Sequence, residues 1–387
     1  MIPYGRQEIT EDDIIEVKKI LRSDFLTQGP TVPRFEKAIA SYCGVNHAAA
    51  VNSATSALHI SCLALGLGPG DLLWTSPNTF VASANCGRYC GADIDFVDID
   101  AETYNMSVDA LSEKLIKAEK LGKLPKIVVP VHFAGQPCDM FSIYDLSKRY
   151  GFKIIEDASH AIGASYNKIK VGSCTHSDIT VFSFHPVKII TSAEGGMALT
   201  NNKDIADKIL RLRTHGITTD KIKMEERPKE EIWNYQQIEL GFNYRMNDIQ
   251  AALGLNQMKR LDEYVKSRHK IANYYDVKLK NLALKTPWQP PHVYSSYHLY
   301  PILIKPNSDF KTQRQTYDEL RKSNIGVNSH YIPVHRHPYY ENLGFKKNDF
   351  PVAEKFHRES ISIPMYPTLQ DEHQAYIIET LKKVMNE

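Results

Sequence analysis

Two largely apolar runs set the fold class: Lys126-Ile127-Val128-Val129-Pro130-Val131 and Phe152-Lys153-Ile154-Ile155, with helical periodicity over residues 140–150 between them. Continuous apolar runs of this length are typical of strands that are buried on both faces. A strand, a helix and a second strand form the unit from which parallel sheets are built. The pattern therefore predicts an α/β fold with a mostly parallel sheet and helices on both of its faces.

The same alternation continues on either side of this unit. We expect further buried strands at residues 48–51, 72–75, 94–97 and 178–184, and further helices at residues 14–21, 32–42, 58–66 and 108–120. In such sheets ligands bind beyond the carboxyl ends of the strands, so that edge is where chemistry is expected.

The C-terminal third has a different pattern. From Asn247 a long amphipathic helical pattern runs to Tyr275, and a strand is then expected at 297–304, with helices at 312–322 and 370–385. We predict a large α/β domain over residues 1–250, which includes the N-terminal helical segment. A connecting helix and a small α+β domain would follow over residues 251–387. The highly charged stretch 218–237 is expected to form an inserted surface loop.

Composition excludes several classes of protein. The 387 residues include 47 Lys and Arg and 45 Asp and Glu, a formal net charge of +2, with 42% apolar and 24% charged residues. These are ordinary values for a globular protein and exclude disorder, collagen and a coiled coil. The near-neutral balance argues against nucleic acid or an anionic membrane as partner.

The expected location is the cytoplasm. No apolar run approaches the roughly 18 residues of a membrane span, and the N-terminus soon becomes acidic at Glu11-Asp12-Asp13, unlike a signal peptide. The six cysteines contain no C-x-x-C pair, so we expect buried free thiols in a reducing compartment.

Three polar segments follow predicted strands. The first, Asn52-Ser53-Ala54-Thr55-Ser56-Ala57-Leu58, opens a helix, where free N–H groups favour an anion such as phosphate; the segment is equally readable as a plain N-cap. The second, Glu156-Asp157-Ala158-Ser159-His160, places Asp157 where a carboxylate can pair with a cationic ring nitrogen or simply cap a helix. The third ends at Lys188 within an apolar run, where a lysine can lose solvent and act as a nucleophile, or lie exposed in a loop.

Taken together, the three segments are more specific than any of them alone. A phosphate cradle, a carboxylate for a ring nitrogen and a Schiff-base lysine are the groups that pyridoxal phosphate requires. The sequence therefore predicts a pyridoxal-phosphate site.

The order of these segments resembles a known family. Ser183-Phe184-His185-x-x-Lys188, Glu194-Gly195-Gly196 and Gly241-Phe242-Asn243-Tyr244-Arg245-Met246, with the segments after residues 51 and 155, resemble the DegT/DnrJ/StrS aminotransferases over nearly the whole chain. These are fold-type I pyridoxal-phosphate enzymes that act on nucleotide-linked keto sugars. Segments 1–7, 25–30 and 74–85 are most similar to the members that aminate C4 of the sugar precursor of pseudaminic acid.

The resemblance implies a role for each matching residue. Lys188 would hold the cofactor as a Schiff base and move the proton, with pyridoxamine phosphate formed between the two half-reactions, and Asp157 would pair with the pyridinium nitrogen; these two are the expected catalytic residues. The expected cofactor-binding residues are Ala54, Thr55, Phe80, Asp157, His160, Ser183, Lys188 and Asn243. His160 stands where the family often has Gln, near the ring hydroxyl, and Asn243 would reach the cofactor phosphate of a neighbouring subunit.

The resemblance also implies the partners. The expected substrates are L-glutamate and a UDP-linked 2-acetamido-2,6-dideoxy-hexos-4-ulose, handled by a homodimer with composite active sites. The expected substrate-binding residues are Tyr4, Asp24, Phe25, Leu26, Thr27, Thr55, Ser183, Asn243, Asn328, Ser329, His330 and Tyr331.

Other hypotheses stay open beside this one. The substrate could be another nucleotide-linked keto sugar, of the perosamine, bacillosamine or 3-amino type, and a non-catalytic cofactor-binding scaffold is a further alternative. Relatives that dehydrate carry His in place of Lys188, so the lysine favours transamination. His330, His335 and His337 lack metal-ligand spacing, so no metal is expected. Arg211 and Arg213 are more simply a basic helix end than an anion site.

Overall fold

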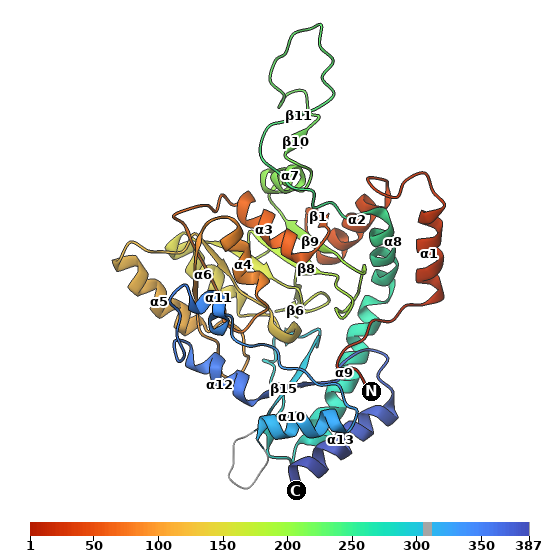
Figure 1. Ribbon diagram of the computed structural model, residues 1–387, viewed down its shortest axis with the longest axis vertical. Helices are drawn as coiled ribbons and strands as arrows, with labels where there is room; N and C mark the ends of the chain where they lie inside the picture. The colour runs from red at the N-terminus through yellow and green to blue at the C-terminus, as the bar shows by residue number, and fades with distance from the viewer. Residues whose placement is uncertain (305–311, 387) are drawn as a thin grey trace.

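The computed structural model describes residues 1–304 and 312–386, and a seven-stranded sheet lies at its centre (Figure 1). The strand order is β1 (His47–Val51), β9 (Gly196–Thr200), β8 (Ile179–Ser183), β5 (Lys153–Asp157), β4 (Ile127–Val129), β2 (Leu72–Thr75) and β3 (Asp93–Phe96). The five strands from β8 to β3 are parallel to one another, and β9 runs antiparallel to both β1 and β8. The predicted α/β class and mostly parallel sheet are confirmed.

Two layers of helices bury this sheet. The helices of this part are α1 (Glu11–Leu21), α2 (Thr31–Cys43), α3 (Ala54–Ala64), α4 (Ala82–Tyr89), α5 (Val108–Lys120), α6 (Met140–Tyr150), α7 (Lys203–Leu212) and α8 (Asp248–Gln257). Apolar residues of α3, α4 and α7 share one core with alternate residues of the strands, including Ile155. The intervening strand residues face the other helices. Ile154 packs with α5 and α6, and Phe182 packs with α2 and α8. Because both faces are covered, the strands carry the unbroken apolar runs seen in the sequence.

A second, smaller sheet follows in the C-terminal part. It consists of β12 (Leu284–Lys285), β14 (Tyr300–Ile304) and β15 (Ser360–Ile363), all antiparallel. Its apolar core is shared with the long helix α9 (Leu261–Leu279), α10 (Gln313–Lys322) and α13 (Asp371–Asn386). The short helices α11 (Pro338–Glu341) and α12 (Pro351–Glu359) join it to the large sheet's core. The predicted α+β unit is present, and the strand expected at 297–304 begins at Tyr300. The boundary at residue 250 stays a prediction.

One prediction about the elements was wrong in detail, and the inserted surface loop was confirmed. The pattern expected as one long helix from Asn247 is divided by a 3₁₀ turn at Met258–Arg260 between α8 and α9. The charged 218–237 segment is an arm that projects from the body (Figure 1), and a short pair, β10 (Ile217–Thr218) and β11 (Gln236–Gln237), closes its base. A three-stranded patch of β6 (Ser165–Tyr166), β7 (Ile169–Lys170) and β13 (Val293–Tyr294) was not predicted.

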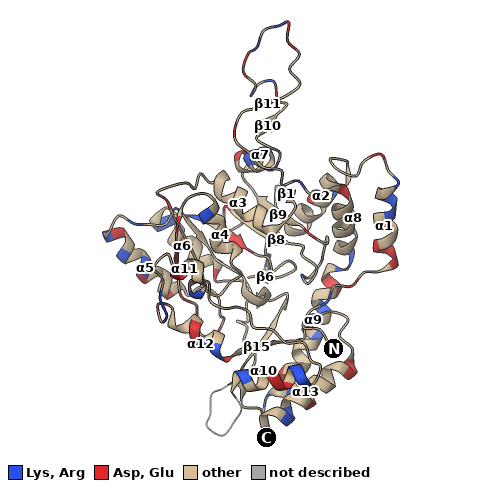
Figure 2. Ribbon diagram, in the orientation of Figure 1, with Lys and Arg blue, Asp and Glu red and all other residues tan. Residues whose placement is uncertain are grey.

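Charged residues of both signs are interspersed along the outer helices and the arm (Figure 2). All six cysteines are buried and free, as expected. No helix within residues 1–304 and 312–386 has the length and apolar content needed to cross a membrane.

Candidate active site

A cavity of about 450 Å³ opens at the carboxyl ends of β5 and β8, where the sheet topology predicts a ligand. Most of the expected site residues line it: Tyr4, Ala54, Thr55, Phe80, Asp157, His160, Ser183, Lys188, Asn328, Ser329, His330 and Tyr331. They come from segments that span more than 300 positions of the chain, so the fold is what brings them together.

The start of α3 forms one end of the cavity. Ser53 caps the helix, because its Oγ accepts from the N–H of Ser56 at 3.1 Å. Ala54 and Thr55 begin the helix, so their backbone N–H groups have no intrahelical acceptor. These groups lie at the positive end of the helix dipole, which is the end at the cavity. Gly196 on β9 packs so closely beneath this turn that a Cβ there would lie 2.5 Å from the Ala54 nitrogen. This close packing fixes the position of the first turn of α3.

Lys188 lies in the same cavity after the end of β8. Its N–H donates to the carbonyl of His185 at 2.9 Å, which closes the turn around Pro186. Burial lowers the pKa of the Lys188 amine to about 8, and the negative charge of Asp157 opposes that shift. A lysine with such a pKa is present partly as the free amine at neutral pH.

Asp157 is the last residue of β5 and is buried. Ser83 Oγ donates to its Oδ2 at 2.6 Å, and the N–H of Ser159 donates to its Oδ1 at 3.1 Å. These two donors fix the rotation of the carboxylate. Ser83, on α4, was not identified from the sequence, because a lone serine within a helix gives no signal of this contact.

His160 lies between Tyr331 and a second histidine. Its Nε2 is 3.1 Å from the Tyr331 hydroxyl, and its ring centroid is 4.4 Å from that of His298, which was also not identified from the sequence. Burial, with the charge of Lys188 and the proximity of His330, lowers the pKa of His160 well below its usual value, so the ring is neutral. Its buried Nδ1 has no partner among the described residues. A buried polar atom without a partner beside a cavity indicates a ligand contact.

The mouth of the cavity is aromatic and polar. Phe80 is 58% exposed, and its ring faces that of Tyr331 at 6.3 Å. Asn328 donates to Nε2 of His330 (3.4 Å), whose Nδ1–H donates to Ser362 (2.9 Å). Burial and the charge of Lys188 lower the pKa of His330 to about 3, so this side chain is also neutral.

Some expected residues lie outside the cavity of a single chain. Asp24, Phe25, Leu26 and Thr27 are exposed in the loop between α1 and α2, and Asn243 is exposed beside Thr214. None of them lines the cavity. Within one chain the 24–27 loop therefore does not reach the cavity, whereas Asn243 was expected to act in a neighbouring subunit; both ligand contacts stay predictions.

The remaining polar candidates have structural partners. Within the described part of the chain, no group of three His, Cys, Asp or Glu has a metal-binding arrangement. His335 pairs with Glu354 at 3.0 Å. At the end of α7, Arg211 pairs with Glu239 at 2.8 Å and Arg213 with Glu36 at 2.5 Å, so neither is a free anion-binding group.

The donor set of the cavity fits pyridoxal phosphate. The start of α3 suits the phosphate, the exposed ring of Phe80 offers a stacking face, the Asp157 carboxylate suits a protonated ring nitrogen, and the Lys188 amine suits the aldehyde. Fold and cavity together define a fold-type I, pyridoxal-phosphate-dependent aminotransferase.

Comparison with known proteins identifies the family. Residues 7–382 match the DegT/DnrJ/EryC1/StrS aminotransferase family, and the chain belongs to it. The protein is therefore a pyridoxal-phosphate-dependent sugar aminotransferase.

Individual relatives are similar over the whole chain. The UDP-4-amino-4,6-dideoxy-N-acetyl-beta-L-altrosamine transaminase of Campylobacter jejuni serotype O:2 is 38% identical, with 100% of this chain and 98% of that protein covered. The spore coat polysaccharide biosynthesis protein SpsC of Bacillus subtilis is 37% identical, with 99% and 97% covered.

Two solved structures are also similar. Helicobacter pylori PseC, an aminotransferase involved in the biosynthesis of pseudoaminic acid, superposes with a TM-score of 0.89 at 31% identity, over 100% of this chain and 99% of that one. The sugar aminotransferase Spr1654 of Streptococcus pneumoniae, in its PMP form, gives 0.89 at 30% identity, with 100% and 99% covered.

Proposed function

We propose that this aminotransferase moves the amine of L-glutamate to the C4 ketone of a UDP-2-acetamido-2,6-dideoxy-hexos-4-ulose. The products would be 2-oxoglutarate and UDP-4-amino-4,6-dideoxy-N-acetyl-β-L-altrosamine. The observation that carries this choice of sugar is the full-length similarity, at 38% identity, to a transaminase named for that product. The similar fold of PseC, from the same kind of pathway, supports it.

Lys188 and Asp157 carry the chemistry in this proposal. The cofactor supplies an electron sink next to the carbon that bears the amine. Lys188 would hold the cofactor aldehyde through Nζ. Once displaced by an amine, it would move one proton between the cofactor and the substrate carbon that bears the amine: from the glutamate carbon to the cofactor in the first half-reaction, and from the cofactor to C4 of the sugar in the second. Its pKa of about 8 suits both directions of transfer near neutral pH. Asp157, oriented by Ser83 and Ser159, would keep a proton on the ring nitrogen of the bound cofactor.

The other lining residues bind and orient. Ala54, Thr55 and Ser183 would hold the phosphate, Phe80 would stack on the ring, and neutral His160 would contact the ring hydroxyl through its free Nδ1. Tyr4 and the segment Asn328, Ser329, His330 and Tyr331 lie at the mouth, where the sugar would enter. Asn243 and the 24–27 loop would act across a homodimer interface.

A second sugar is also supported by a specific observation. SpsC, whose name places it in spore coat polysaccharide biosynthesis, is 37% identical over nearly the whole chain, almost the same value as the altrosamine transaminase. Another nucleotide-linked keto sugar is therefore the alternative to be tested. The cytoplasmic location stays a prediction.

The test is direct product analysis. The purified enzyme is incubated with L-glutamate and a panel of UDP- and dTDP-linked 3-keto and 4-keto sugars, and the amino sugars are identified by NMR. The proposal expects the UDP-4-keto-6-deoxy-N-acetyl sugar to give the highest kcat/KM, with the amine at C4 in the L-altro configuration. A higher kcat/KM for any other sugar overturns the proposed sugar substrate. Failure of glutamate to donate its amine overturns the proposed first half-reaction.

A further inference from the structure

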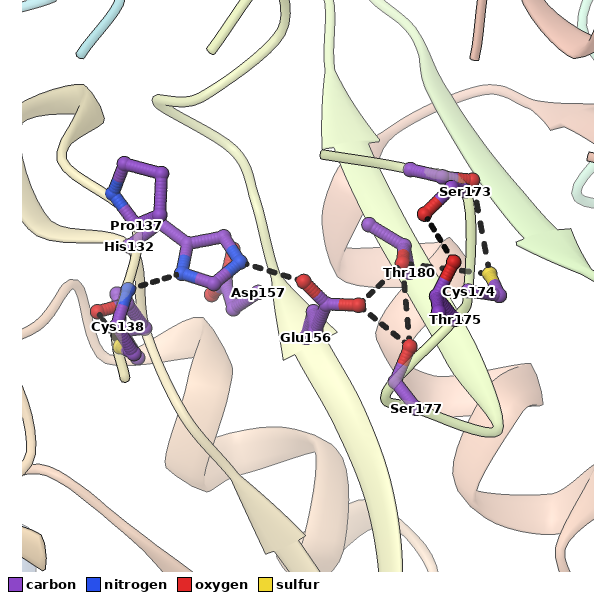
Figure 3. A network of polar contacts seen from close by, with 12 residues as sticks. His132, Pro137, Cys138, Glu156, Asp157, Ser173, Cys174, Thr175, Ser177 and Thr180 are labelled. Carbon is purple, nitrogen blue, oxygen red and sulfur yellow. Dashed lines mark hydrogen bonds and ion pairs between the residues drawn. The ribbon is translucent and has the colours of Figure 1, made fainter. Parts of the chain in front are cut away.

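A buried polar cluster lies behind Asp157 and has no part in the steps above (Figure 3). Glu156 precedes Asp157 on β5, and successive side chains of a strand point to opposite faces of the sheet. Asp157 accordingly meets Ser83 of α4 on one face. Glu156 enters the other face, where it contacts His132 and Thr180.

Glu156 is a buried carboxylate held by three side-chain hydrogen-bond donors. Its Oε2 accepts from His132 Nε2 at 2.7 Å, and its Oε1 accepts from Ser177 at 2.5 Å and Thr180 at 2.8 Å. Burial raises the pKa of Glu156, but these hydrogen bonds outweigh that effect and the net shift is downward, so the carboxylate is ionised. Apolar residues usually stabilise a core at least as well as such a group, so its presence calls for a reason beyond stability.

His132 joins this charge to the backbone of the site. Its Nδ1 accepts from the N–H of Cys138 at 3.0 Å, so the ring proton is on Nε2, toward Glu156. The backbone N–H of His132 donates to the carbonyl of Asp157 at 3.1 Å, and the N–H of Asp157 donates to Pro130 at 2.9 Å. One residue therefore contacts the Glu156 side chain and the Asp157 main chain at once.

The loop that follows His132 packs against residues that line the cavity. The ring centroid of Phe133 lies 6.4 Å from those of both His160 and Tyr331. Gly135 has a φ of 94°, and a Cβ there would clash with Ser296 and would lie 2.9 Å from the carbonyl of His160. A loop packed this tightly transmits a displacement of His132 to its neighbours.

We propose that His132 and Glu156 are positioning residues for Asp157. Ser83 and Ser159 fix the rotation of the Asp157 carboxylate, whereas the His132–Glu156 pair fixes the main chain from which that carboxylate projects. The pair thus sets the distance and angle at which Asp157 meets the ring nitrogen of the cofactor. This inference rests on the role of Asp157 proposed above and is independent of which sugar is the substrate.

The test is a double-mutant cycle read out as the dissociation constant of pyridoxal phosphate, measured by absorbance titration without sugar or glutamate. His132→Leu removes the donor to buried Glu156, and we expect binding to weaken about tenfold. His132→Gln, whose amide keeps an N–H for Glu156, is expected to stay within about threefold of wild type. In an Asp157→Asn background, His132→Leu should add less than about twofold, because residues that act through one another are not additive.

The His335–Glu354 pair provides a matched control. Its side chains are equally buried and 3.0 Å apart, and neither lines the cavity. His335→Leu is expected to lower the melting temperature while leaving the pyridoxal-phosphate dissociation constant unchanged. Equal effects of His132→Leu and His335→Leu on that constant would overturn the inference, as would full additivity with Asp157→Asn.

If the His132→Leu variant does not fold, Glu156→Gln replaces it in the double-mutant cycle with Asp157→Asn. This substitution keeps the shape of the Glu156 side chain and removes only its charge. The same non-additivity with Asp157→Asn is expected. Additive effects again overturn the inference. Since no sugar is present, a wrong sugar assignment leaves this result untouched.

Discussion

At the scale of single residues, Lys188 owes its reactivity to its surroundings. Its pKa of about 8 is far below that of an exposed lysine, because burial disfavours the charged form more than Asp157 favours it. Below that pKa the free amine increases tenfold per pH unit. We therefore expect the rate of pyridoxal-phosphate incorporation into the apo-protein to rise with pH and level off near pH 8, as measured by stopped-flow absorbance. A rise that continues beyond pH 10 would show an ordinary lysine.

Removal of this amine should be more costly than any other single change. We expect Lys188→Ala to lose the visible absorption band of the holoenzyme and to lose turnover by more than the roughly 10²–10⁴-fold attributable to general acid–base help alone. Absorbance and product formation are the measurements. Lys153→Ala is the control, since Lys153 is exposed and paired with Asp178. Wild-type activity in Lys188→Ala would remove the lysine from the mechanism.

The contribution of the Asp157 charge to the reaction rate can be measured separately from the contribution of the side chain's shape. Asp157→Asn keeps a hydrogen-bonding group but cannot hold a ring proton by charge, so both half-reactions are expected to slow by at least tenfold, about 1.4 kcal/mol. Ser83→Ala keeps the charge and removes only one donor, and a smaller loss is expected. Single-turnover rates for each half-reaction test both. Rates within about threefold of wild type in Asp157→Asn would contradict the pairing.

The limits of sequence reasoning are clearest at this scale. The place of Lys188 and Asp157 at the ligand edge of the sheet could be predicted because both lie at or just after strand ends, in segments that together match a family pattern. Ser83 and His298 could not, since their contacts with Asp157 and His160 are made by residues distant in sequence. His132 was not identified from the sequence, and Glu156 was noted only as the residue before Asp157; only the fold shows that the two side chains meet.

At the scale of elements, the approach of β9 to the start of α3 can be tested. A Cβ on Gly196 would lie 2.5 Å from the backbone of Ser53 and Ala54, so Gly196→Ala must displace the first turn of α3. We expect at least tenfold weaker binding of pyridoxal phosphate with a smaller effect on kcat at saturating cofactor. Gly68→Ala, where a Cβ meets nothing within 4 Å, is the matched control. An unchanged dissociation constant in Gly196→Ala would argue against α3 as the phosphate cradle.

Elements with a local signature were predicted well. The helix expected at residues 14–21 is present as α1, where Thr10 and Asp13 form a capping box, and the strands of the large sheet have the unbroken apolar runs of buried strands. The break between α8 and α9 at Met258–Arg260 has no proline or glycine to mark it. The two-residue strands β10 and β11 at the base of the arm are too short to show a period.

At the scale of the whole molecule, the fold class could be predicted but the strand order could not. Alternating strands and helices imply a parallel sheet whatever the order. The order itself, and the antiparallel placement of β9, depend on pairings between residues as far apart as His47 and Thr200. A local sequence pattern does not show which distant strands pair.

The position of Asn243 leads to the last prediction, on assembly. Asn243 and the 24–27 loop are exposed and lie outside the cavity of their own chain. If a second copy brings them to the site, a two-fold dimer has two composite sites. Two variants, Lys188→Ala and Asn243→Asp, then show which subunit contributes each residue to an active site. In a heterodimer of the two, one site carries both changes and the other carries neither.

The heterodimer can be isolated by co-expressing the two chains with different affinity tags and purifying on both. We expect about half of wild-type activity, because one of its two sites is intact, although each variant homodimer is impaired. Lys188→Ala paired with the wild-type chain, which also leaves one intact site, calibrates that value. A purified heterodimer no more active than the average of the two variant homodimers would place Asn243 in its own subunit. Its role would then be structural, at the bridge to Thr214.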